Sequence, residues 1–259
     1  MRTTSVNPWV VRLTPREEAR VRLLCFPHAG GGTSLWRPWA TTPGLPAWVE
    51  VAAIQLPGHG SRGGEPLVTE SEHLVEALVQ AVLPMAGEGL PLALFGHSLG
   101  GLLAFEVARR LSRVRMKPLL LAIAACRAPQ LPERLTGIPD DETLTRALRA
   151  ARTQPEALAG KLALLRAGYA LRLSYHYRLA EPLPCPIIVY GGREDNEVTP
   201  MELCGWGEQA AERFQLRMFP GGHFFLHEAS VRPRVVQKLG KALAREDVQS
   251  SSSSAERRQ

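Results

Sequence analysis

Cysteine is scarce in this sequence, and the few cysteines are not paired. Cys25, Cys126, Cys185 and Cys204 are the only four in 259 residues, and no two of them form a Cys-x-x-Cys motif. Three of them lie in or beside apolar, strand-like runs, where a free cysteine behaves as a small buried hydrophobic residue. This spacing argues against a disulfide framework or a zinc site and favours a reducing compartment.

Long apolar runs are absent as well. The longest is Leu119–Cys126, whereas a membrane-spanning helix needs about 20 apolar residues. The first residues, MRTTSVNPWVVRL, also lack the apolar core of a signal peptide. We therefore expect a cytoplasmic protein that has no membrane partner.

Lysine is rare, although the chain is basic. Lys and Arg total 31 against 25 Asp and Glu, for a formal net charge of +6, yet only four of the 31 are lysine. The arginines are scattered, and no basic helix or aromatic stacking platform is visible, so we expect no nucleic-acid partner. A diffuse positive field favours an acidic protein partner; the alternative is surface charge without a role.

Apolar runs of strand length recur along the chain. Most are continuously apolar, as in strands buried on both faces of a parallel sheet. A shorter run, Trp9–Leu13, predicts an edge strand. The six main runs are Val21–Phe26, Val49–Leu56, Pro91–Gly96, Pro118–Ala125, Pro186–Gly191 and Phe214–Phe219.

Between these runs lie segments with apolar residues every three or four positions, which is helical spacing. They are Ser71–Met85, Leu102–Leu111, Thr199–Phe214 and a last helix from about His227 to Ala244. Alternating strands and helices predict a doubly wound α/β sheet with mostly parallel strands.

One region breaks this alternation. Residues 129–184 contain leucine-rich helical patterns and no good strand. We interpret them as a helical lid over the carboxyl edge of the sheet, where ligands bind in open α/β folds; the alternative is a set of extra helices that enlarges the core. The chain then divides into one domain over residues 1–245 and a polar, low-complexity tail over 246–259, which we expect to be disordered.

A sharp turn after the third main strand carries the first candidate for catalysis. Gly96-His97-Ser98-Leu99-Gly100 matches the G-x-S-x-G motif between a predicted strand and a predicted helix. The flanking positions must be small because neighbouring chain passes close to the strained serine backbone. The turn exposes the Ser98 hydroxyl, and the start of the helix favours developing negative charge. Ser98 is therefore the predicted nucleophile.

A serine hydroxyl needs a base and an orienting acid. In the hydrolase order the base follows the last strand, where Pro-Gly-Gly-His places His223; His227, four residues later, is interpreted as a capping or surface residue. The acid is expected in the run after the strand Pro186–Gly191. We choose Asp195 there, with Glu194 and Glu197 as solvated neighbours, since the other position used in this fold reads CRAPQ and has no carboxylate.

The oxyanion donors are expected on two sides of the serine. One is the backbone N–H of Leu99, which follows the nucleophile, and the other is an N–H of the loop FPHAGGG, most simply that of Ala29. A phosphate-binding glycine loop is the alternative. It is disfavoured because the stretch lacks the lysine of a P-loop and the G-x-G-x-x-G spacing.

With these pieces placed, the sequence resembles the type II (external, editing) thioesterases that accompany modular polyketide and nonribosomal peptide synthases, within the α/β-hydrolase superfamily. The matching stretches are LLCFPHAGGGTSLWRPWA, VEVAAIQLPGHGSR, LFGHSLGGLLAFEVARRL, YGGREDNEVTP and FPGGHFFL. They occur in the family's order over nearly the whole chain except its tail. Carried over by motif, the resemblance implies Ser98 as nucleophile, Asp195 as acid and His223 as base.

The resemblance also implies a substrate that the residues alone do not show. This is an acyl group on the phosphopantetheine thiol of an acyl or peptidyl carrier protein, removed to clear stalled or mis-primed synthase modules through an acyl-serine intermediate. It implies no cofactor and no metal, and a protein that works as a monomer. The basic charge agrees, because carrier proteins are generally acidic.

The sequence departs from the family pattern at a few positions. Leu99 stands where Met is common, Gly101 where Ala is frequent and Asn196 where Pro often follows the acid. Gly168 and Ser174 in the predicted lid replace frequent acidic residues. Because the oxyanion donor is a backbone N–H, Leu99 is expected to serve, but acyl-chain preference does not follow from the resemblance.

Three other functions remain as alternatives. They are a carboxylesterase for soluble esters, an acyltransferase that passes the acyl group to an amine or alcohol, and a non-catalytic binding protein on the same fold. The complete set of serine, acid and histidine disfavours the last of these, and the loops FPHAGGG and PGGHFFL favour a thioesterase over the first.

Overall fold

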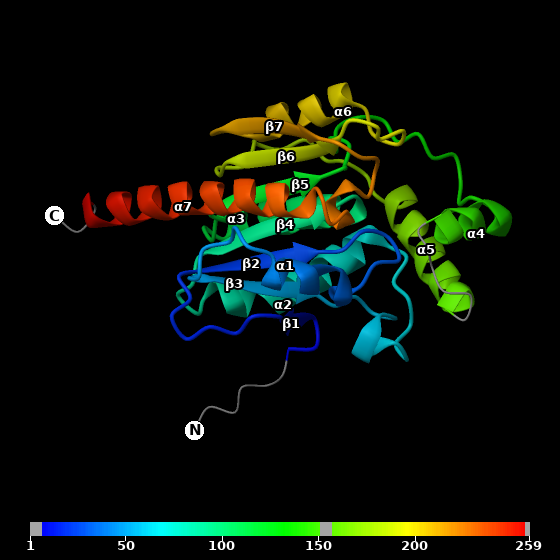
Figure 1. Cartoon of the computed structure of the whole chain (residues 1–259), viewed down its shortest axis with the longest axis horizontal. Helices are drawn as coiled ribbons and strands as arrows, with labels where there is room; N and C mark the ends of the chain where they lie inside the picture. The colour runs from blue at the N-terminus through cyan, green and yellow to red at the C-terminus, as the bar shows by residue number, and fades with distance from the viewer. Residues whose placement is uncertain (1–6, 151–156, 257–259) are drawn as a thin grey trace.

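The computed structural model describes residues 7–150 and 157–256 of the chain. Its centre is a seven-stranded sheet with the order β1-β3-β2-β4-β5-β6-β7 (Figure 1), in which only β1 is antiparallel, paired with β3. The six main strands and the edge strand expected from the sequence are all present. They are β1 (Val10–Arg12), β2 (Val21–Phe26), β3 (Val49–Ile54), β4 (Leu92–His97), β5 (Leu120–Ala124), β6 (Ile187–Gly192) and β7 (Phe214–Phe219).

The continuous apolar runs are explained by helices on both faces of the sheet. Side chains alternate between the faces along each strand. In β2, Leu24 packs on the side of α2 (Ser71–Ala86) and α3 (Leu99–Arg113), while Leu23 packs on the side of α7 (Arg232–Glu256). The second side also contains η1 (Thr33–Trp36) and α1 (Arg37–Thr41), whose two tryptophans are fully buried. The core is thus two apolar layers with the sheet between them.

Two helices of the 129–184 segment, α4 (Asp141–Ala150) and α5 (Leu158–Leu173), lie at one end of the sheet (Figure 1). Helix α5 packs closely on the loop that follows β2: a Cβ added at Gly168 would lie 2.4 Å from the Cβ of Ala29. Only glycine fits here unless the loop shifts, which gives a steric reason for the absence of an acidic residue at position 168.

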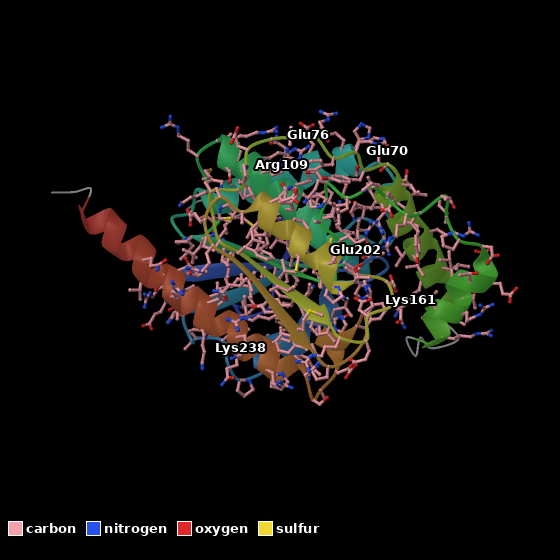
Figure 2. All side chains as sticks on the ribbon, turned by 90° about the horizontal axis from the view of Figure 1, so that it is seen from above. Glu70, Glu76, Arg109, Lys161, Glu202 and Lys238 are labelled. Carbon is pink, nitrogen blue, oxygen red and sulfur yellow. The ribbon has the colours of Figure 1, made fainter. Side chains whose placement is uncertain are left out.

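Two predicted helices differ from the structure. The segment Thr199–Phe214 forms only a short helix, α6 (Pro200–Cys204), followed by the 3-10 helix η4 (Gly205–Gln209). Thr199 and Glu202 form a capping box that begins α6, and the carboxylate of Glu202 (labelled in Figure 2) also accepts a hydrogen bond from Arg127 at 2.7 Å. Two glycines, at 205 and 207, weaken a longer helix.

The C-terminal segment also differs from expectation. The last helix begins at Arg232 and not at His227, because Phe225–His227 forms the 3-10 helix η5. Helix α7 then continues to Glu256, past residue 246, where the sequence predicts the start of a disordered tail; residues 257–259 lie outside the described part. The side chains of Glu246 and Asp247 are 6% and 7% exposed and pair with Arg213 and Arg20, which anchors this part of the helix to the domain.

All four cysteine thiols are free, and three of them are buried; Cys204 is exposed. Within residues 7–150 and 157–256, no helix combines the length and apolar character needed to cross a bilayer.

Candidate active site

Ser98 occupies the turn between β4 and α3 in a strained conformation. Its φ of 52° and ψ of −122° are rare for a residue with a side chain. The turn is held by a hydrogen bond from the Ser98 N–H to the carbonyl of Ala124 at 2.8 Å. The chain is tightly packed around it: a Cβ at Gly96 would lie 2.1 Å from the Gly100 carbonyl oxygen, and one at Gly100 would lie 2.3 Å from that of Phe26. The strain is typical of functional sites and exposes the hydroxyl.

His223 lies between Ser98 and Asp195. Its Nε2 is 3.0 Å from Ser98 Oγ, and its Nδ1 is 3.0 Å from Asp195 Oδ2. An ionised carboxylate can only accept hydrogen bonds, so Nδ1 carries the proton and Nε2 presents its lone pair to the hydroxyl. Residues far apart in the sequence, from loops after β4, β6 and β7, thus form one continuous hydrogen-bonded chain.

The environment of Asp195 favours its charged form. Its side chain is 1% exposed, and burial alone opposes ionisation, yet hydrogen bonding to His223 and to two backbone N–H groups outweighs it and lowers the pKa of Asp195. The two backbone donors, Glu197 and Val198, lie 2.8 and 3.1 Å from Asp195 Oδ1. A carboxylate held this way can orient the imidazole and stabilise an imidazolium.

The two glutamates beside Asp195 have different surroundings. Glu194 accepts a hydrogen bond from the Gly221 N–H, which ties the acid loop to the glycine-rich loop of His223. Glu197 is half exposed, but its Oε2 lies 3.8 Å from His223 Nε2, on the edge of the ring that faces Ser98. The expectation that Glu197 is only a solvated neighbour misses this contact.

The two residues expected to donate to the oxyanion, Ala29 and Leu99, both lie beside Gly168 of α5. A Cβ added at Gly168 of α5 would touch Ala29 and would also lie 3.6 Å from the Leu99 side chain. Leu99 is the first residue of α3, where backbone N–H groups have no intrahelical partner and the helix dipole favours negative charge. Both N–H groups are therefore carried by segments that meet beside Ser98.

A cavity of about 450 Å³ lies beside Ser98 and His223. Ser98, Leu99 and His223 line one end of it, and segments after β5 and after α5 line the rest, with aliphatic and tyrosine side chains. Three charged groups in the wall interact: Glu133 accepts hydrogen bonds from Arg172 at 3.1 Å and lies 3.6 Å from Arg127. The wall is mixed in polarity, with no unbalanced run of one charge.

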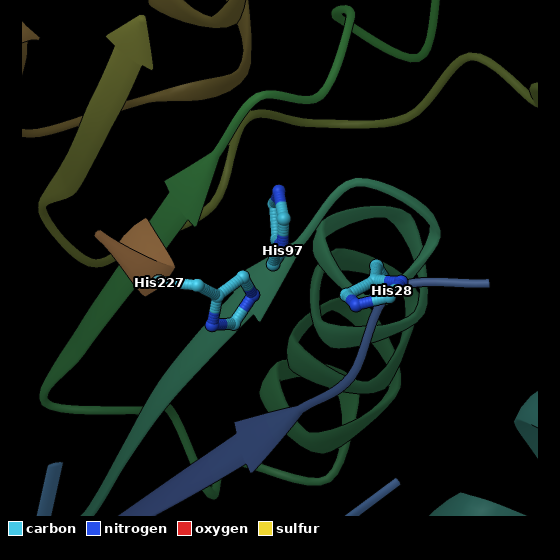
Figure 3. Close-up of side chains that lie close together, drawn as sticks. All are labelled: His28, His97 and His227. Atoms are coloured by element: carbon cyan, nitrogen blue, oxygen red, sulfur yellow. The ribbon is translucent and has the colours of Figure 1, made fainter. Parts of the chain in front are cut away.

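A second group of imidazoles lies next to His223. His97 is fully buried, and its Nε2 donates to the carbonyl oxygen of His223 at 2.8 Å. His28 makes a similar bond from Nδ1 to the carbonyl of Ala29 at 2.8 Å. His227 faces both rings (Figure 3), with ring centroids 5.4 Å from His97 and 5.7 Å from His28. The interpretation of His227 as a capping or surface residue is therefore wrong.

Comparisons with known proteins match most of the chain. A family model, the thioesterase domain, matches residues 21–243. The gramicidin S biosynthesis protein GrsT of Aneurinibacillus migulanus is 36% identical over 236 residues, which cover 87% of this chain and 91% of that protein.

Two solved structures are similar in both sequence and fold. RedJ, a thioesterase from the prodiginine biosynthetic pathway in Streptomyces coelicolor, is 33% identical with a TM-score of 0.80, covering 90% of each chain. The type II thioesterase BorB from the borrelidin biosynthetic cluster is 31% identical with a TM-score of 0.81, covering 93% of this chain and 98% of that one.

Proposed function

Because this chain belongs to the thioesterase family and has the α/β-hydrolase fold of its relatives, we propose that it is an editing thioesterase. Its substrates are acyl thioesters on the phosphopantetheine arm of acyl or peptidyl carrier proteins, and it clears stalled or mis-primed modules of a polyketide or nonribosomal peptide synthase. The observation that carries the proposal is the hydrogen-bonded chain Ser98–His223–Asp195 at the end of a cavity.

The reaction follows from the arrangement of these groups. Ser98 Oγ attacks the thioester carbonyl while His223 Nε2 takes its proton, and the backbone N–H groups of Ala29 and Leu99 receive the oxyanion. The C–S bond then breaks, and the imidazolium returns the proton to the departing thiolate. An acyl-serine ester remains, and water activated by His223 hydrolyses it to the free acid and restores the hydroxyl. No step uses a metal ion or cofactor.

The site suits a thioester in two ways. A thiolate leaves readily, so little assistance to the leaving group is needed beyond the proton on His223. The cavity of about 450 Å³ lies within the size range of sites for small molecules, about 300–1,000 Å³, and the aliphatic and tyrosine side chains in its mixed wall offer contacts to an acyl chain. We propose that α4 and α5 act as the lid over this cavity.

The relatives support the choice of partner. GrsT is a gramicidin S biosynthesis protein, RedJ comes from a prodiginine pathway and BorB from a borrelidin cluster. Carrier proteins of such systems are generally acidic, and the net charge of +6 favours their encounter with this chain. We further propose that the enzyme works as a cytoplasmic monomer.

The test is release of acyl groups from one carrier protein loaded with a panel of acyl chains, followed by mass spectrometry of the phosphopantetheine arm. We expect multiple turnovers with the native enzyme and none with Ser98→Ala, and a preference for thioesters over matched oxygen esters. Efficient hydrolysis of soluble oxygen esters without release from the carrier protein would indicate a carboxylesterase. An amine or alcohol that outcompetes water for the acyl-enzyme would indicate an acyltransferase.

A further inference from the structure

Three histidines from distant parts of the chain converge beneath the active site. His28 follows β2, His97 is the last residue of β4 and His227 ends η5 (Figure 3). One ring nitrogen of each lies within 4.8 Å of the corresponding nitrogens of the other two. The proposed mechanism uses none of these rings as a catalytic group.

The hydrogen bonds of two of the rings determine which nitrogens are free. A backbone carbonyl only accepts, so His28 carries its proton on Nδ1, facing Ala29, and His97 carries its proton on Nε2, facing the His223 carbonyl. Their other nitrogens, His28 Nε2 and His97 Nδ1, are then lone-pair donors. His97 Nδ1 and His227 Nε2 are buried and have no hydrogen-bond partner among the described residues.

Burial keeps these rings uncharged. It lowers the pKa of His28 to about 3 and that of His227 to about 4, and it takes the pKa of His97 well below its ordinary value. Neutral imidazoles are the form that binds metal ions. Histidines that bind metal usually donate their second ring N–H to a carbonyl or carboxylate, which is the arrangement of His28 and His97.

We propose that His28, His97 and His227 form a binding site for one transition-metal ion of the Zn²⁺ class, through His28 Nε2, His97 Nδ1 and His227 Nε2. Three imidazoles are a known ligand set for zinc, with Zn–N bonds of about 2.0–2.1 Å. Nitrogens around a tetrahedral ion lie about 3.4 Å apart at that bond length, so the rings must close inward on the ion.

This closure affects the catalytic loops. The outer nitrogens of His28 and His97 are bonded to the carbonyls of Ala29 and His223, so inward movement of either ring displaces an oxyanion donor or the base. A displacement of about 1 Å can reduce the rate about a hundredfold. The bound ion is therefore an inhibitor, and this second part of the proposal rests on the proposed thioesterase function.

The surroundings set the strength of binding. No carboxylate belongs to the ligand set, and the positive charge of Arg232 contributes to the lowered pKa of His227. The same positive charge opposes a dication, as does that of Lys161 near His28. We therefore expect dissociation constants in the micromolar range, as in a regulatory or opportunistic site, and not the tighter binding of structural zinc.

Binding is tested on the full chain with Zn²⁺ alone, by calorimetry and by competition with a chromogenic chelator. His227→Gln removes one ligand without removing either bond to a catalytic loop, and exposed His73→Gln on α2 is the matched control. We expect one ion per chain for the native protein and for the control, and at least tenfold weaker binding for His227→Gln. Circular dichroism and thermal melts verify that each variant is folded.

Inhibition is measured as a fraction of each variant's own metal-free rate. Zn²⁺ should inhibit the native protein and His73→Gln, a chelator should reverse this, and His227→Gln should resist at the same concentration. Absence of stoichiometric binding, or equal binding by His227→Gln, would overturn the site; equal inhibition of His227→Gln would place the inhibiting ion on His223 and its carboxylates. Because binding is read without substrate, a failed metal site is distinguished from a failed thioesterase assignment.

Discussion

His223 and the three imidazoles beneath it lie in one cluster of rings but have different surroundings. The centroids of His223 and His97 are only 5.4 Å apart. His223 has a carboxylate on one nitrogen and a hydroxyl on the other, and its side chain is 10% exposed. His97 is fully buried, with a backbone carbonyl on one nitrogen and, among residues 7–150 and 157–256, no hydrogen-bond partner on the other.

This difference shows how the surroundings of identical side chains determine which of them can accept a proton. A carboxylate stabilises the imidazolium that forms when a base takes a proton, whereas burial without a counter-charge prevents protonation. His223 can therefore accept a proton during the reaction, and the other three remain neutral. His28 and His97 donate hydrogen bonds to the backbone carbonyls of Ala29 and His223, and their other ring nitrogens carry lone pairs. Five substitution or pH experiments test this division.

The largest effects are expected for the reacting pair. Ser98→Ala removes the nucleophile and His223→Ala removes the base, so each should lower kcat by about 10⁴-fold or more while the protein remains folded. Steady-state release from a loaded carrier protein measures this. More than a tenth of native turnover in either variant would contradict the assignment.

The next largest effect is expected at the carboxylate that distinguishes His223 from the buried rings. Asp195→Asn should lower kcat by about 10³- to 10⁴-fold, because the amide no longer enforces the tautomer with the proton on Nδ1. Glu194→Gln is the matched control, since Glu194 lies in the same loop but bonds to the Gly221 N–H. If the control is the more damaging change, Asp195 is the wrong acid.

We expect the lowered pKa values of His28, His97 and His227 to make the stability of the protein depend on pH. Because their folded pKa values are depressed below 6.5, they are neutral when folded but become protonated when unfolded as the pH falls from about 6.5 towards 4. The free energy of unfolding therefore falls over that window. His227→Gln should reduce this loss by about 1–2 kcal/mol.

Denaturant unfolding at a series of pH values measures this effect. The carboxylates with lowered pKa, such as Asp195, begin to contribute below about pH 5, so the difference between native protein and His227→Gln from about pH 5 to 6.5 isolates the imidazole of His227. A slope that is identical in native protein and His227→Gln would show that folding does not lower the pKa of His227.

A smaller effect is expected when the hydrogen bond between His97 and the His223 carbonyl is weakened. His97→Gln weakens the bond that holds the His223 carbonyl, so the base is less well positioned, and kcat should fall by about ten- to a hundredfold with KM nearly unchanged. Separate determination of kcat and KM tests this. A change confined to KM, or a loss explained by unfolding in a thermal melt, would reject a positioning role.

The smallest effect is expected for Glu197. Its carboxylate is 3.8 Å from His223 Nε2 but 56% exposed, and solvent screens such a pair. Glu197→Gln should therefore lower kcat/KM by less than about tenfold. A loss comparable to that of Asp195→Asn would make Glu197 a second essential acid. The two carboxylates would then not differ in their importance for catalysis.

Several features follow from local sequence patterns because their causes are local. Each strand is a continuous apolar run, and the turn at Ser98 needs small flanking residues, so both can be predicted from short stretches. The placement of His223 and Asp195 after the last two strands rests on order along the chain. Parallel strands bring their carboxyl ends to one edge, and the order therefore implies the proximity.

Other features depend on contacts that no short stretch contains. The inward orientation of His227 results from packing η5 against His28 and His97, and the extension of α7 past residue 245 is stabilised by Arg20 and Arg213, which come from two distant segments.

The amino-acid sequence by itself determined the strand pattern, the strained serine turn and the residue types available for catalysis, because these depend on burial and backbone sterics within a few residues. Only the tertiary structure decided which imidazole meets a carboxylate and which ones meet each other. That choice depends on long-range packing, and the packing sets the burial and hydrogen-bond partners from which each histidine takes its chemistry.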